Sequence, residues 1–119
     1  MVTSSLIGLP LDWAVAQATD TKIIVYTEHL FHGPSPIIRL SNWDRWEPSI
    51  NWNQCGPLIE EFLIQLIPSG GGWEAQTDLR LGSSHWVRSY GETPMVSICR
   101  AVVMSKFGDT VSIPKELLE

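Results

Sequence analysis

The stretch TPMVSICRAVVMSKFG, residues 93–108, carries the local signals of an amphipathic helix. Thr93 is a typical N-cap residue, Pro94 fits the first helical position, and Gly108 follows the last turn. Lys106 lies in the last turn, where a cation suits the helix dipole. One stripe of the segment is apolar: Met95, Ile98, Cys99, Val102 and Val103. The pattern predicts a helix that buries this stripe in the core.

Two shorter helices are expected upstream. Residues 10–18 place apolar side chains at the spacing of one helix face: Leu11, Ala14, Val15 and Ala18. Pro57 fits the first position of another helix over residues 57–62.

Strand-like segments account for most of the remaining chain. Residues 22–27 are β-branched and aromatic, and residues 63–67 are strand-like. A glycine-rich turn at 69–72 precedes residues 73–77, which alternate as the return arm of a hairpin would. Two further strands and a tail are expected at residues 85–90, 110–113 and 114–119.

Residues 32–57 contain four prolines and many polar side chains, which favour irregular structure. A loop of this length in a folded domain is usually functional or disordered, and its tryptophans favour function. Together the segments predict a single α+β domain over residues 1–119, in which an antiparallel sheet packs with two to three helices.

Composition narrows the class of partner. The net charge of −5, with only eight Lys and Arg, argues against binding to a nucleic-acid polymer, which needs clustered cations. No stretch approaches the length needed to span a bilayer, so no membrane partner is expected. Cys55 and Cys99 lie in unlike contexts, which favours reduced thiols and an intracellular setting over a disulfide framework.

Three of the six tryptophans, Trp43, Trp46 and Trp52, fall within ten residues. They are interleaved with polar residues, and two interpretations remain open. The rings pack on the sheet while Asn51 and Gln54 satisfy loop backbone groups. Alternatively, the rings stack on a flat polar ligand whose edge is recognised by amide side chains: Asn51, Asn53 and Gln54.

Two further features of the sequence could bind an anionic group of such a ligand. Gly56 and Pro57 lead into the expected helix, whose N-terminus either binds a phosphate or is simply capped. Arg100 lies at the border of the apolar stripe, where it either reaches solvent along the protein surface or holds a carboxylate or phosphate.

No catalytic constellation stands out. His29 and His32 are followed by glycine and proline without a third ligand at a suitable spacing, so no metal site is expected. Nothing places a histidine beside Cys55, and Glu60 and Glu61 are adjacent, as on a solvated helix face. We therefore predict no catalytic residue, no cofactor and no enzymatic activity.

Three blocks of the sequence resemble the NinX-like family of small bacteriophage proteins, whose function is unknown. They are residues 11–16 (LDWAVA), residues 48–60 (PSINWNQCGPLIE) and the segment from Thr93 to Asp109. The middle block differs from the family pattern at Asn51, Asn53 and Cys55, so a role that needs a carboxylate at position 51 is not carried over.

This resemblance implies a phage accessory protein that acts in the cytoplasm of the infected host. The leading hypothesis is a non-catalytic sponge that sequesters a nucleotide-derived immune signal, of the cyclic ADP-ribose or cyclic oligonucleotide type. Its expected site is formed by Trp46, Asn51, Trp52, Asn53, Gln54, Gly56 and Arg100, in a homodimer or larger oligomer. The alternatives are a module that inhibits a host factor through a Trp-rich surface, and an enzyme that degrades such a signal.

Overall fold

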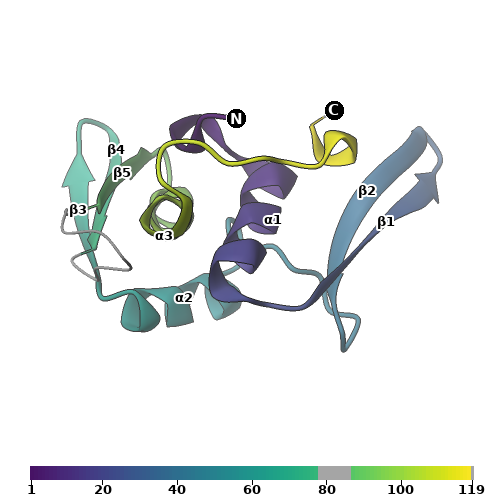
Figure 1. Cartoon of the computed structure of the whole chain (residues 1–119), viewed down its shortest axis with the longest axis horizontal. Coiled ribbons are helices and arrows are strands. Elements are labelled where there is room, and N and C mark those ends of the chain that lie inside the picture. Colours follow the sequence, from purple (N-terminus) through teal and green to yellow (C-terminus); the bar gives the residue numbers. More distant parts are fainter. Residues whose placement is uncertain (78–86, 119) are drawn as a thin grey trace.

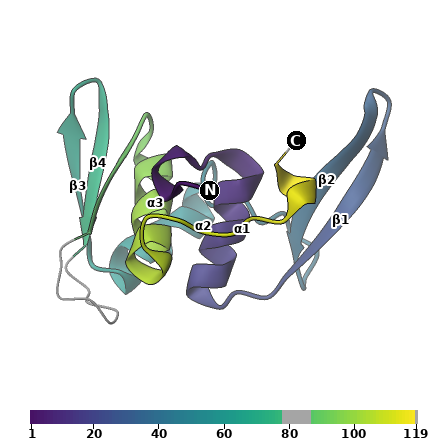
Figure 2. The ribbon, with the colours of Figure 1, turned by 45° about the horizontal axis from the view of Figure 1, so that its top comes forward.

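Two antiparallel sheets lie on opposite sides of a layer of helices (Figure 1, Figure 2). The computed structural model describes residues 1–77 and 87–118. The helices are α1 (Gly8–Thr19), α2 (Trp52–Glu61) and α3 (Pro94–Phe107), with short 3-10 helices at Thr3–Ser5 and Lys115–Leu117. One sheet pairs β1 (Ile23–Leu30) with β2 (Gly33–Leu40). The other has the order β3 (Ile64–Ser69), β4 (Gly72–Thr77), β5 (Val87–Gly91). The expected α+β class is confirmed, with the strands divided between two sheets.

Helix α3 forms at the centre of the molecule as its sequence predicts. The Thr93 hydroxyl accepts a hydrogen bond from the Val96 N–H at 3.1 Å, and Gly108 ends the helix with φ 82°. Its apolar stripe packs against α1, α2 and the three-stranded sheet, and all of the stripe except the partly buried Met95 is buried. Each buried aliphatic side chain of this kind stabilises the fold by about 1.5–3 kcal/mol.

Gly91 allows the three-stranded sheet to approach α3 closely. A Cβ at this position would lie 2.6 Å from the Ser97 nitrogen and 3.0 Å from the Ser97 Cα. Both are backbone atoms of the helix and have no room to move aside. Any side chain at position 91 would therefore push β5 and α3 apart.

The β3–β4 hairpin confirms the turn expected from the glycine-rich segment. Ser69 pairs with Gly72, and the two residues between them, Gly70 and Gly71, have φ values of 53° and 87°. Two consecutive positive φ values are typical of the type I′ turns that join such strands. The strand expected at residues 85–90 is found as β5 from Val87, while residues 85 and 86 lie outside the described residues.

The prediction of irregular structure over residues 32–57 is wrong for its first part, because Gly33–Leu40 forms β2. Pro34 and Pro36 pair with His29 and Thr27 of β1. Since the two prolines are two residues apart, their nitrogens lie on the same side of the strand. On an edge strand that side needs no ladder hydrogen bond, so proline is tolerated there.

Two other boundaries differ from expectation. Helix α2 begins at Trp52, so Pro57 lies inside the helix and not at its first position. Residues 110–113 do not form a strand, and only Thr110 makes an isolated bridge, to Val2. The chain at Thr3–Ser5 turns at once into a 3-10 helix, which leaves too short a partner for a ladder. Among the residues that the structure describes, no helix is long and apolar enough to cross a bilayer.

Candidate functional site

The tryptophan-rich segment begins as a tight return along β2. The Leu40 N–H donates to the Asp44 carbonyl at 2.8 Å, and the Trp46 N–H donates to the Ile38 carbonyl at 2.9 Å. At the turn, Trp43 adopts a positive φ of 76°, which is uncommon for a bulky residue. The segment from Ser41 to Trp46 is thus held by main-chain hydrogen bonds against the outer edge of the sheet.

Trp46, expected to stack on a ligand, is only 7% exposed. Its indole N–H donates to the backbone carbonyl of Asp12 in α1 at 2.7 Å. The packing interpretation therefore holds for most of this ring. One part of it nevertheless lines a pocket beside β2.

Asp12 binds the next part of the segment. Its carboxylate Oδ1 accepts a hydrogen bond from the Ser49 N–H at 2.9 Å. Burial raises the pKa of this carboxyl from 3.8 to about 7, while hydrogen bonding from Ser49 opposes the shift and the charge of Glu47 adds to it. Asp12 and Trp46 together fasten α1 to the chain that leads into α2.

The first turn of α2 presents the predicted amides. Asn51 is the N-cap, and its side-chain oxygen accepts from the Asn53 N–H at 2.9 Å. Gln54 joins the turn to the preceding segment, because its Oε1 accepts from the Glu47 N–H at 2.7 Å and its Nε2 donates to the Arg45 carbonyl at 2.6 Å. Both ends of the Gln54 amide are thus used by backbone groups, as one of the two interpretations expected.

A polar surface pocket of about 500 Å³ opens between the return segment and α2. Its walls carry amides, carboxylates and a guanidinium: Leu40, Asp44, Arg45, Glu47, Asn51, Asn53 and Gln54. Three of the seven predicted site residues, Asn51, Asn53 and Gln54, are therefore brought together. Within the described part of the chain, the Arg45 guanidinium has no hydrogen-bond or ion-pair partner.

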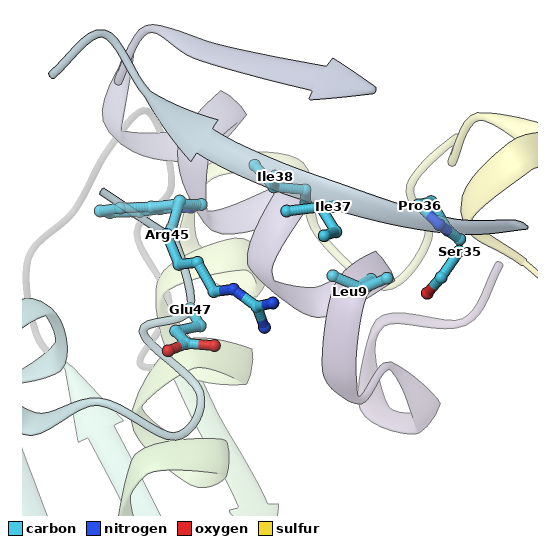
Figure 3. Close-up of a pocket in the computed structure, with 8 residues that line it drawn as sticks. Leu9, Ser35, Pro36, Ile37, Ile38, Arg45 and Glu47 are labelled. Carbon is cyan, nitrogen blue, oxygen red and sulfur yellow. The ribbon is translucent and has the colours of Figure 1, made fainter. Parts of the chain in front are cut away.

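A second pocket of about 270 Å³ adjoins the first, and both are lined by Arg45 and Glu47. Figure 3 shows these two charged side chains at one end, with Ser35 and Pro36 at the other. The rest of the wall is apolar and is formed by Leu9, Ile37, Ile38 and Trp46. The two pockets together offer a polar and an apolar compartment that meet at one cation.

The other predicted site residues lie elsewhere. Trp52 is 48% exposed at the start of α2, and neither it nor Gly56 lines the two pockets. Because α2 begins at Trp52, the expected helix N-terminus at Gly56 and Pro57 is wrong.

Arg100 also lies away from these pockets. Its Nε donates to the Leu6 carbonyl and its Nη1 to the Tyr90 carbonyl, both at 2.8 Å. It lines a separate pocket with Ile7, Tyr90 and Glu92, where partial burial lowers its pKa. Its guanidinium therefore serves the packing of α3 against the chain on either side, which neither interpretation from the sequence anticipated.

A partly exposed aromatic stack was missed from the sequence. Tyr26 and Trp43 stack with ring centroids 5.4 Å apart and an interplanar angle of 19°. Arg39 donates from Nε to the Tyr26 hydroxyl at 2.7 Å and from Nη1 to the Trp43 carbonyl at 2.8 Å. The strand pattern around Tyr26 is the sequence signal for this stack. Because residues 33–40 were expected to be a loop, Arg39 could not be placed on a strand beside Tyr26.

The described residues contain no cluster of three or more potential metal ligands. Cys55 of α2 and Cys99 of α3 are free thiols that are both fully buried. The Cys55 thiol donates to the Met95 carbonyl at 3.9 Å, and the neighbouring Cys55 together with burial raises the pKa of Cys99.

One protein family matches nearly the whole chain. No curated protein matches the sequence. Residues 2–106 match the family model described as Bacteriophage P22, NinX, which confirms the resemblance carried by the three sequence blocks. The matched range includes α1, the return segment, both pockets and nearly all of α3. The chain therefore belongs to the NinX family of bacteriophage P22.

Proposed function

We propose that the protein binds and sequesters a small nucleotide-derived immune signal in the cytoplasm of the infected host, without cleaving it. The observation that carries this proposal is the pair of adjoining pockets that share Arg45 and Glu47. A nucleotide combines a flat base, a hydroxylated sugar and a phosphate. The apolar compartment suits the base, the amides and carboxylates suit the sugar, and Arg45 suits the phosphate. Membership of a phage protein family supports a role in the cytoplasm of the infected host.

The charges of the pockets favour one type of signal. Arg45 is the single cation among the residues that line the two pockets, whereas Asp44 and Glu47 are acidic. Cyclic ADP-ribose and a cyclic dinucleotide both carry two phosphates, but those of cyclic ADP-ribose are joined in one diphosphate, which a single guanidinium can contact. The phosphates of a cyclic dinucleotide are separated by nucleosides, so the second would need another cation. We therefore propose a ligand of the cyclic ADP-ribose type in preference to a cyclic oligonucleotide.

Isothermal titration with cyclic ADP-ribose and with a cyclic dinucleotide tests the proposal. We expect binding heat from the first, and a weakening of about tenfold or more in Arg45→Gln, since a charge-assisted bond to phosphate is lost. Arg88→Gln is the matched control, because Arg88 is exposed on the three-stranded sheet, away from both pockets. Folded protein that gives no heat with either compound refutes the proposal.

The same samples separate a sponge from an enzyme. After long incubation with the protein, the bound compound should be recovered intact by chromatography. A cleaved product would favour the signal-degrading enzyme, the third interpretation of the sequence.

A second candidate function is inhibition of a host protein through the tryptophan-rich surface. It is favoured by exposed apolar side chains around the start of α2, where Ile50 is 69% and Trp52 48% exposed. Tryptophan is enriched at binding hot spots. Pull-down from host lysate should then retain one protein in stoichiometric amount, and Trp52→Ala should abolish its retention.

A further inference from the structure

The β1–β2 hairpin has one closed edge and one open edge. On the outer edge of β2, the Ile38 carbonyl and the Leu40 N–H are hydrogen-bonded to the return segment. The same edge passes Pro34 and Pro36, which have no N–H to offer. Most of the outer edge of β2 is thus paired with the return segment or lacks donors.

The register of the hairpin determines which main-chain N–H and C=O groups of β1 point outward. In an antiparallel pair, two opposite residues either exchange both main-chain hydrogen bonds or direct both groups away from each other. Ile38 and Leu40 direct theirs away from β1, so their partners Val25 and Ile23 direct theirs away from β2. The alternation continues to Thr27, opposite Pro36, and to His29, opposite Pro34.

The outer edge of β1 is therefore a row of N–H and C=O groups at Ile23, Val25, Thr27 and His29. None of them is hydrogen-bonded to another part of the chain that the structure describes. Both ribbon views place the hairpin beyond α1, on the side away from the three-stranded sheet (Figure 1, Figure 2). An unblunted edge of this length is a template for pairing with another strand.

We propose that a second copy of this chain pairs along β1, so that two hairpins form one four-stranded antiparallel sheet. The strand is complementary to itself about Val25. With Val25 opposite Val25 of the partner subunit, Lys22 faces Glu28 of the partner subunit at both ends. Ile24, which is 44% exposed, faces Tyr26 of the partner subunit. Aromatic–aliphatic and opposite-charge pairs are the contacts that stabilise neighbouring strands.

This register also agrees with the hydrogen-bonding groups. It places Ile23 opposite Thr27 of the partner subunit, and both residues direct their main-chain groups outward. The strand thereby gains the neighbours that an isolated hairpin lacks, since two strands alone are marginally stable. The inference does not depend on the proposed ligand.

Light scattering coupled to size-exclusion chromatography, run over a concentration series, tests the pairing. We expect a mass twice the 13.3 kDa of the chain. Thr27→Pro should give a monomer, because proline removes an outward N–H and its ring blocks the edge. The hairpin itself should survive, since Thr27 is exposed and its N–H does not point toward β2. Thr27→Val keeps the N–H and is the matched control, expected to remain dimeric.

A charge exchange tests the register by a route that does not disturb the backbone. Lys22→Glu places like charges opposite each other at both ends, and we expect the dimer dissociation constant to rise by about tenfold. Adding Glu28→Lys should restore it. Circular dichroism confirms that each variant is folded. A wild-type chain that stays monomeric at every concentration, or a dimer unchanged in both folded Thr27→Pro and Lys22→Glu, overturns the proposal.

Discussion

Asp12 is a carboxyl group placed where its charge is unfavourable. It lies buried in α1 and accepts a hydrogen bond from Ser49, yet burial outweighs that bond and raises its pKa to about 7. In the unfolded chain the group titrates near 3.8. The folded state therefore binds a proton more tightly than the unfolded state between these two values.

This difference predicts how stability changes with pH. The contribution of Asp12 is greatest below pH 3.8, falls as pH rises, and is lost once pH exceeds about 7. The total loss is roughly 4 kcal/mol, from about 1.4 kcal/mol per pKa unit. Asp12→Asn retains an oxygen that can accept from Ser49 but carries no charge. We expect urea denaturation to show the variant more stable than the wild type at pH 8, and the difference to shrink or reverse at pH 4. Parallel stabilities at both pH values would contradict the assignment.

Trp46 offers a second test at the scale of one residue. Trp46→Phe keeps a buried ring but removes the indole N–H, leaving the Asp12 carbonyl without this donor. We expect a loss of about 1–3 kcal/mol in unfolding free energy, the usual cost of an unpaired buried polar group. Trp43→Phe is the control, because Trp43 is 54% exposed and a phenyl ring still stacks on Tyr26.

The sequence could not predict which residues surround each side chain of the site. Trp46 and Asp12 are 34 residues apart, and no local pattern relates them. Asn51 and Asn53 were found because polar residues among tryptophans mark a surface segment. Arg100 was misplaced because one partner, Leu6, is 94 residues away, and the other, Tyr90, meets it only because β5 packs on α3.

Elements were predictable where their signals are local. The cap, proline and C-terminal glycine of α3 lie within the helix and its ends, so that helix was correctly bounded. Pro57 misled the assignment of α2, because proline at a first helical position is commoner than proline further inside. Strand β2 was missed since its prolines are acceptable only on an edge, which is a property of the sheet and not of the segment.

Two glycines should respond to different extents to the same substitution. Gly91→Ala forces β5 away from α3, and we expect a loss of about 1–3 kcal/mol in unfolding free energy. Gly56→Ala lies in α2, where the added Cβ meets no atom within 4 Å apart from its chain neighbours and its own helix backbone. The usual gain of about 0.5–1 kcal/mol from replacing a helical glycine is offset because a Cβ crowds the ring of Pro57, so we expect a smaller change than for Gly91→Ala. Thermal denaturation of both variants measures the contrast. A stable Gly91→Ala protein would mean that the sheet and α3 are less tightly apposed.

At the scale of the whole molecule, the helices form a shared interior between two sheets. Cys55 and Cys99 meet there, with neither side chain exposed. A thiol reagent reaches them only when helices α2 and α3 separate.

We therefore expect both thiols to resist Ellman's reagent in the native protein and to react fully in denaturant. The native reaction should be slower on the order of a hundredfold or more, because it waits for the interior to open. Cys55→Ser and Cys99→Ser assign the two signals. Rapid labelling of either thiol in folded protein would contradict this burial.

Trp46 gives the molecule a built-in optical reporter. Its ring borders the apolar pocket while its N–H is fixed to α1, whereas Trp43 and Trp52 face solvent. Acrylamide should therefore quench the emission of the exposed rings first and leave the blue-shifted emission of the less exposed rings, which include Trp13 and Trp73. The part of this emission that is missing in Trp46→Phe belongs to Trp46. A molecule that enters the apolar compartment would change that residual emission directly, so occupancy can be followed in unlabelled protein.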